Sequence, residues 1–79
     1  MKEYEVWMEG YCATGNSAPH RFIGKVKAET FKDACYIAVK NWCINDEEFV
    51  RYYNAEKQSF WGCRLFDNER DSMFFDWKG

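Results

Sequence analysis

Few side chains in this sequence of 79 residues have the types and spacing that catalysis requires. The single histidine, His20, lies between Pro19 and Arg21, and no sequence neighbour marks it as half of an acid–base pair. Cys12 lies nearby and could pair with His20 as thiolate and imidazolium, an arrangement that activates a nucleophile. A solvated histidine and a reduced thiol explain the same residues without catalysis, and the sequence favours that interpretation.

The cysteines and the acidic residues near the N-terminus give little support for a metal site. No two cysteines have the Cys-x-x-Cys spacing typical of zinc sites and redox pairs. The four are Cys12, Cys35, Cys43 and Cys63, and we expect reduced thiols that pack as small apolar side chains. A ladder of charge pairs explains Glu3, Glu5 and Glu9 better than a cation site does. The sequence therefore predicts no catalytic residue, no metal and no cofactor.

Aromatic residues are the remaining candidates, and they make up 20% of the sequence. A chain this small has few interior positions for side chains that bury about 150–250 Å² each. We therefore expect some aromatic rings to reach the surface beside arginine, a combination that anchors protein interfaces and stacks on nucleobases. The predicted binding residues are Trp7, Tyr11, His20, Arg21, Phe60, Trp61 and Arg64.

Two segments of alternating sequence must position this surface. Residues 3–11 and 21–28 both alternate with period two, which indicates two half-buried strands. In an antiparallel pair, Glu3, Glu5 and Glu9 of the first strand would lie across from Lys25, Lys27 and Arg21 of the second. Phe22 is expected on the opposite face, together with Val26 and Ala28. Residues 12–20, which contain Gly15 and Pro19, predict a loop.

Helical periodicity marks residues 31–43, with Thr30 in position to cap the helix. The apolar stripe of this segment contains Ala34, Cys35 and Ala38, so we expect the helix to approach the sheet closely.

The second half of the chain is less regular. Asn45 or Asp46 could cap a short helical turn, and residues 54–58 are typical of a turn or a polar hairpin tip. Residues 59–66 predict a third strand in which Gly62 indicates a bulge or a close neighbour, and residues 69–77 predict a final helix.

These elements predict one α+β domain over residues 1–79 with the order β-β-α-β-α. We expect a small three-stranded, mainly antiparallel sheet, the helix of residues 31–43 on one face, and a C-terminal helix closing the other side or an edge. The net charge of −2, with acidic and basic residues well mixed, disfavours a long nucleic acid as partner. The sequence shows neither a membrane span nor a signal-peptide pattern, so we expect a cytoplasmic monomer or small homo-oligomer.

Three stretches of the sequence are specific enough to compare with known families. They are Tyr4-Glu5-Val6-Trp7-Met8-Glu9-Gly10-Tyr11 with Ala13-Thr14-Gly15, Glu29-Thr30-Phe31 with Asp33-Ala34-Cys35, and Trp61-Gly62-Cys63-Arg64-Leu65-Phe66-Asp67-Asn68-Glu69. Through them the chain resembles a family of short, uncharacterised bacterial and bacteriophage proteins. It departs from that family at Ser72-Met73-Phe74-Phe75-Asp76-Trp77, where the relatives have a polar helix. The resemblance implies a setting of phage or bacterial accessory genes, and it carries over no activity, cofactor or site residue.

Binding without turnover is the function that these features predict. The resemblance and the aromatic surplus favour a phage or mobile-element type of inhibitor that binds and occludes a host protein, such as a defence enzyme. One alternative is a small-ligand module that holds a nucleotide between aromatic rings near Trp7, Arg21 and Trp61. A second is a small thiol enzyme that uses Cys12 or Cys63.

Overall fold

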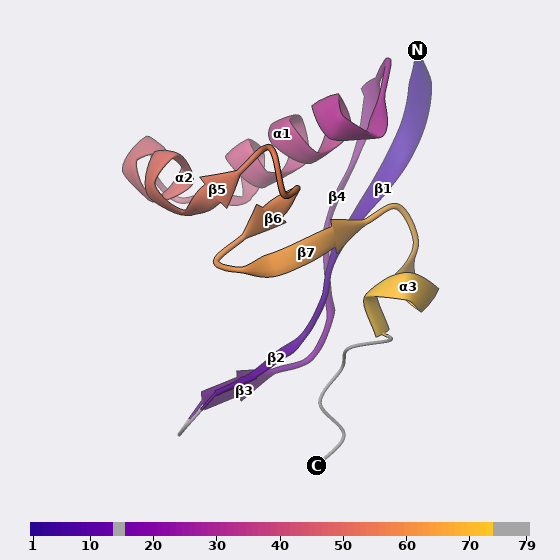
Figure 1. The fold of residues 1–79 in the computed structure, drawn as a ribbon. Helices are drawn as coiled ribbons and strands as arrows, with labels where there is room; N and C mark the ends of the chain where they lie inside the picture. Colours follow the sequence, from indigo (N-terminus) through magenta and orange to yellow (C-terminus); the bar gives the residue numbers. More distant parts are fainter. Residues whose placement is uncertain (14–15, 74–79) are drawn as a thin grey trace.

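The central sheet has five strands in the order β4-β1-β7-β6-β5 (Figure 1). This computed structural model describes the side chains of residues 1–10 and 19–73 and the backbone of residues 11–13 and 16–18. The strands of the sheet are β1 (Lys2–Met8), β4 (Arg21–Ala28), β5 (Tyr53–Asn54), β6 (Ser59–Phe60) and β7 (Cys63–Phe66), all in antiparallel pairs. The helices are α1 (Phe31–Trp42), α2 (Asp46–Tyr52) and α3 (Glu69–Met73). The predicted α+β class and antiparallel sheet are confirmed, whereas the predicted count of three strands is wrong.

Charge pairs fix the register of β1 against β4 along half of their length. Glu3 lies opposite Lys27 and Glu5 opposite Lys25, as the alternation of the sequence predicts. The Nζ atom of Lys25 lies 3.7 Å from Oε1 of Glu3, a diagonal ion pair between half-exposed side chains. Exposed pairs of this kind contribute at most about 1 kcal/mol, so they select the register more than they stabilise the fold.

A bulge between Val6 and Trp7 changes which side chains face which side of the sheet. Val6 lies opposite Gly24 but Trp7 lies opposite Phe22, so β4 has one extra residue at this point. The shift places Phe22 on the Trp7 face, and it sets Arg21 opposite Met8 instead of Glu9. The predicted faces of Phe22 and Arg21, and the predicted pairing of Arg21 with Glu9, are therefore wrong.

The segment predicted to be a loop between these strands contains two further strands. β2 (Tyr11–Ala13) and β3 (Asn16–Ala18) pair antiparallel, with Tyr11 opposite Ala18. They form a separate two-stranded ribbon that extends away from the main sheet as an arm (Figure 1). Because β1 and β4 already hold the two ends of this segment side by side, a continued ribbon pairs backbone groups that a loop would leave to water.

Helix α1 lies against β1 and β4 and closes the core on one face of the sheet. The Thr30 hydroxyl accepts a hydrogen bond of 3.2 Å from the backbone N–H of Asp33, so the predicted cap is confirmed. The predicted small residues are buried, and a Cβ atom added to Gly24 would lie 3.7 Å from the Cβ of Ala38. The buried apolar core comprises Val6, Met8, Ala28, Ala34, Cys35, Ala38, Val39, Phe49, Phe60, Cys63 and Leu65.

The predicted third strand is in fact two short strands. β6 and β7 are joined by Trp61 and Gly62, whose φ angles are 55° and 78°, so Gly62 belongs to a two-residue hairpin turn instead of a bulge. The turn sets Phe60 opposite Cys63, and both are buried. Before this hairpin, Asn45 caps α2 by accepting a 2.9 Å hydrogen bond from the N–H of Glu48, as predicted.

Helix α3 lies on the other side of the sheet from α2 and contacts β7, β1 and β4 (Figure 1). Asn68 caps it by accepting a 2.8 Å hydrogen bond from the N–H of Asp71. The prediction extends this helix to residue 77, and residues 74–77 lie outside the described part of the chain. Within that part, no helix is both long and apolar enough to cross a membrane.

Candidate functional site

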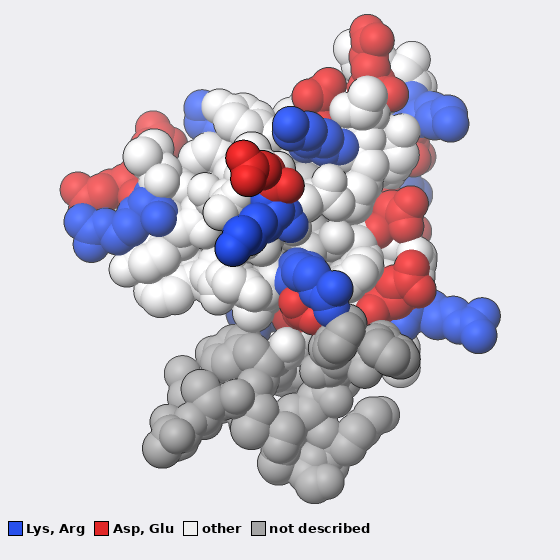
Figure 2. Space-filling view, viewed as in Figure 1, with Lys and Arg blue, Asp and Glu red and all other residues white. Residues whose placement is uncertain are grey.

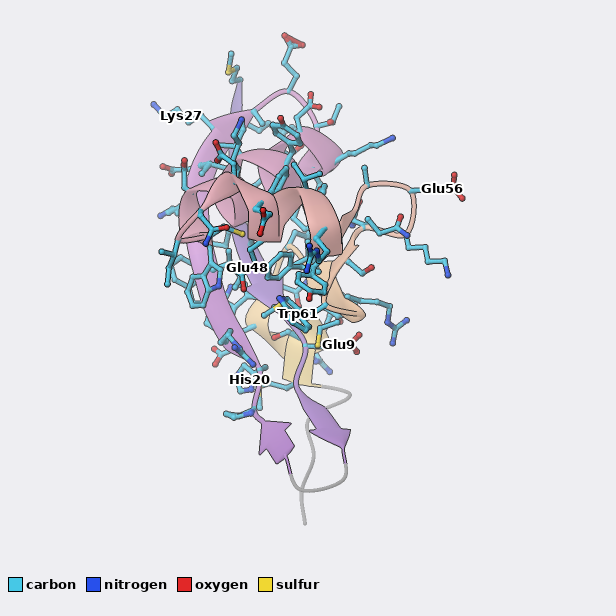
Figure 3. All side chains as sticks on the ribbon, turned by 90° about the vertical axis from the view of Figure 1, so that its left-hand side faces the viewer. Glu9, His20, Lys27, Glu48, Glu56 and Trp61 are labelled. Atoms are coloured by element: carbon cyan, nitrogen blue, oxygen red, sulfur yellow. The ribbon has the colours of Figure 1, made fainter. Side chains whose placement is uncertain are left out.

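A pocket of about 390 Å³ opens where the end of α1, the start of α2 and the β6–β7 turn meet the sheet. Its volume lies in the range of about 300–1,000 Å³ that is typical of small-ligand sites. The lining residues come from six elements of the fold: Met8, Arg21, Trp42, Glu48, Phe60, Trp61 and Cys63. Figure 3 shows two of them, Glu48 from α2 and Trp61 from the turn, on the same side of the molecule.

Trp61 is held in an unusual position at the mouth of this pocket. Its φ of 55° lies in the left-handed region, which suits glycine or asparagine and costs other residues about 1–2 kcal/mol. The Tyr52 ring stacks on one face of the indole, with ring centroids 3.6 Å apart. The backbone N–H of Trp61 donates a hydrogen bond of 3.2 Å to the backbone carbonyl of Tyr52. The side chain is nevertheless 54% exposed. Trp61 is thus fixed in place without being buried.

Three more apolar side chains stand exposed on or beside α1 and α2, and of these Trp42 lines the pocket. Trp42, at the end of α1, is 44% exposed, while Ile44 and Val50, beside and on α2, are 95% and 77% exposed. A shallower hollow lined by Ile44 and Tyr52 shares Glu48 with the pocket. Val50 lines a separate hollow with Asp46, Glu47 and Arg51. It follows Glu48 by two residues and therefore points to the other side of α2. We call Trp42, Ile44 and Trp61 the α2 face. In Figure 2 the left-hand end of the molecule, where α2 lies, carries a cluster of acidic and basic side chains beside a largely uncharged area.

Two charged side chains of opposite sign line the pocket. Arg21 is half-buried at the start of β4, and Glu48 is half-buried in the first turn of α2. A guanidinium only donates hydrogen bonds and a carboxylate only accepts them. The floor is apolar, because Met8, Phe60 and Cys63 are at most 5% exposed. A ligand here would therefore meet aromatic rings, one donor group and one acceptor group above an apolar floor.

The thiols of the described side chains are poorly suited to nucleophilic chemistry. Burial raises the pKa of Cys63, and the charge of Glu9 adds to this rise while that of Arg21 opposes it. Burial also raises the pKa of Cys43, and it raises the pKa of Cys35 to about 12. The thiolate is the reactive form of cysteine, so these positions disfavour the alternative of a thiol enzyme that uses Cys63. The side chain of Cys12, the other residue named for that alternative, lies outside the described part.

The structure brings together only part of the predicted binding set. Arg21, Phe60 and Trp61 meet at the pocket, where Phe60 is 3% exposed and forms part of the floor. Arg64 binds Glu9 instead, whose Oε2 accepts from the Arg64 backbone N–H at 2.6 Å and from its Nε at 3.3 Å. The side chain of Tyr11, also predicted, is not among those described.

Trp7 and His20 form a separate cluster away from the pocket. Side chains alternate along β1, so Trp7 points to the opposite face from its neighbour Met8, which lines the pocket. The Trp7 ring lies 5.0 Å from Phe22 and 5.9 Å from His20, and His20 Nε2 lies 3.0 Å from Oε2 of Glu69 on α3. Figure 3 shows His20 toward the β2–β3 arm, away from Glu48 and Trp61. The structure therefore brings Arg21 and Trp61 together but not Trp7, the third residue of the predicted nucleotide site.

Sequence reasoning missed four residues of this region. Trp42 lies within the helix predicted over residues 31–43, but it is the last residue of α1 and its side chain is 44% exposed. Glu48 lies in the short helical turn that the sequence predicts after Asn45 or Asp46, and no feature of the sequence indicates that it lines a pocket. Ile44 and Val50 are large apolar residues in a mainly polar segment, and neither belongs to the apolar stripe of a predicted helix. This is the sequence feature that could have indicated their exposure.

No group of three or more His, Cys, Asp or Glu residues in the described part of the chain could hold a metal ion. Comparison with family models, with curated proteins and with solved structures finds no match for this chain. The family resemblance and the phage or bacterial setting therefore stay predictions.

Proposed function

We propose that the protein is a non-catalytic binding protein that uses the α2 face to contact another protein. The observation that carries this proposal is Trp61, whose ring is more than half exposed although its backbone is strained. The stack on Tyr52 contributes about 0.5–1.5 kcal/mol, which the left-handed backbone at Trp61 offsets at about 1–2 kcal/mol. Trp61 thus adds little to folding, and such strain clusters at sites of function.

The composition of the α2 face fits a protein contact. Tryptophan is enriched among the residues that dominate binding energy at interfaces, and such residues sit in pockets that exclude water. Trp42 and Trp61 border a pocket with an apolar floor, and Ile44, which lines the adjoining hollow that shares Glu48, extends the apolar surface outward. A protein partner can therefore bury the exposed apolar surface and insert one side chain into the pocket.

Occlusion is the mode of action that we propose for this contact. A chain of 79 residues can cover the working surface of a larger protein without any chemistry of its own. Together with the family resemblance, this supports a phage or mobile-element type of inhibitor that acts on a host defence protein.

A pull-down from bacterial lysate tests the proposal. The wild-type chain is expected to recover a partner in stoichiometric amount, and Trp61→Ala is expected to lose it. Lys32→Ala, an exposed change in the first turn of α1, should leave recovery unchanged. Equal recovery with the Trp61 variant, or no stoichiometric partner with the wild type, would contradict the proposal.

A further inference from the structure

The pocket itself has the lining of a site for a flat ring. Trp42 and Trp61 contribute indole rings, and Tyr52 fixes the Trp61 ring by stacking on one of its faces. Stacking on an aromatic side chain is available to any planar heterocycle. The fixed turn and the stack place the Trp61 ring before any ligand arrives, so less entropy is lost on binding.

Glu48 and Arg21 narrow the class of ring that fits. A carboxylate binds best to two neighbouring N–H donors, and a guanidinium to one or two neighbouring acceptors. Guanine combines both, since its N1–H and N2 amino group are adjacent donors and its O6 and N7 atoms are acceptors. Adenine has no such pair of adjacent donors, and its exocyclic amine replaces the O6 acceptor.

We infer that the pocket binds the guanine base of a small nucleoside or nucleotide. The ring stacks against Trp61, its N1–H and amino group donate to Glu48, and its O6 or N7 accepts from Arg21. Arg21 is the one cation among the described residues that line the pocket, so once it binds the base no second lining cation is left for the phosphate. This inference goes beyond the proposed protein contact, although the two share Trp61.

Titration of the isolated chain with GMP, IMP and AMP, followed by calorimetry, tests the inference. GMP binds most tightly, and IMP, which lacks the 2-amino group, binds about tenfold more weakly because one charge-assisted hydrogen bond is lost. AMP binds more weakly still. Guanosine and GMP bind alike. Equal affinity for GMP and AMP, or no binding of GMP, would overturn the inference.

Two variants test whether residues of the pocket recognise the guanine base. Glu48→Gln weakens GMP binding about tenfold and abolishes the difference between GMP and IMP, whereas Glu47→Gln changes neither. Glu47 is the matched control, since it is an exposed neighbour on α2 that does not line the pocket. Trp61→Ala weakens all three nucleotides about tenfold, because the stacking surface is common to them. An unchanged preference for GMP over IMP in Glu48→Gln contradicts the assignment.

Failure of this inference is distinguishable from failure of the proposed function. The titrations need only the purified chain, whereas the protein contact is measured in lysate. Absence of nucleotide binding overturns the guanine site and leaves the pull-down result as it stands. Conversely, a purified chain that binds GMP and recovers no protein partner supports the site and contradicts the protein contact.

Discussion

Trp61 and Gly62 are two successive residues with left-handed backbone, which is what a two-residue hairpin of this kind requires. Asparagine before glycine is the usual solution, because asparagine tolerates positive φ better than other residues. Tryptophan at this position is a local conflict between backbone preference and side-chain placement. Stacking on the Tyr52 ring offsets part of the free-energy cost of this backbone conformation. The proposed role of Trp61 in contacting a partner explains why the remaining cost is kept.

Replacement of Trp61 separates the backbone strain from the ring. Trp61→Asn and Trp61→Ala both remove the stack on Tyr52, but only asparagine suits the φ of 55°. We expect the Asn variant to be more stable than the Ala variant by about 1 kcal/mol, as measured by urea denaturation. If the Ala variant is equally stable, the turn is not strained as the structure indicates.

The buried Cys35 thiol and the buried hydroxyl of the half-buried Tyr53 make the free energy of unfolding depend on pH in the alkaline range. Burial raises the pKa of Cys35 from 9.0 to about 12 and that of Tyr53 from 10.0 to about 12. Well below pH 9, the ordinary pKa of the Cys35 thiol, both groups are protonated in the folded and unfolded chain, so they cause no pH dependence. Between the ordinary pKa values of these groups and about pH 12, the unfolded chain loses protons that the folded chain retains. The free energy of unfolding therefore falls as the pH rises through this range.

Urea denaturation at about pH 8 and about pH 11 measures this loss of stability. Cys35→Ala is expected to be less stable than the wild type at both values, because it removes a buried side chain, but to lose less stability between them. A wild-type chain whose stability stays constant through this range would show that these groups are not buried as described.

At the scale of elements, the periodic patterns of the sequence predicted the longer strands and the longest helix, whereas the turn residues did not predict the bulge or the β6–β7 hairpin. Alternation predicted β1, β4 and their charge pairing, and helical spacing predicted α1 with its cap. The bulge near Ile23 carries no signal of its own, because the alternation continues across the extra residue. The β6–β7 hairpin was missed because Trp61 occupies a position where asparagine or aspartate is expected.

The contact of α1 with the sheet leaves room for a methyl group at Gly24. Its backbone lies outside the left-handed region, and an added Cβ would meet the Cβ of Ala38 at an ordinary distance of 3.7 Å. Gly24→Ala is therefore expected to raise the free energy of unfolding by about 0.4–1 kcal/mol, because it restricts the unfolded chain. Gly24→Leu should lower it by about 1–3 kcal/mol, since the larger side chain pushes α1 away.

Thermal or urea denaturation of the two Gly24 variants checks this prediction. Gly62→Ala is the matched comparison, because its Cβ would meet nothing within 4 Å and its φ of 78° alone makes the change unfavourable. Stabilisation by Gly62→Ala, or tolerance of Gly24→Leu, would contradict the packing described here.

At the scale of the whole molecule, the sheet separates two aromatic groups that the sequence could not tell apart. Trp7 contacts both Phe22 and His20 on the α3 side, while Trp42 and Trp61 lie at the α1–α2 end. The pocket joins residues from both ends of the chain, from Met8 to Cys63. Such a juxtaposition depends on strand order, so residue types alone predicted that rings would be exposed but not which ones would meet.

Site-specific photo-crosslinking tests the central claim that the α2 face contacts another protein. A photoreactive phenylalanine analogue replaces Ile44 on this face, or Lys32 at the far end of α1 as the control, in chains expressed in bacterial cells. We predict one discrete adduct with a different protein from position 44 and none from position 32. Equal adducts from both positions, no adduct from position 44, or an adduct only with a second copy of the chain would contradict the claim.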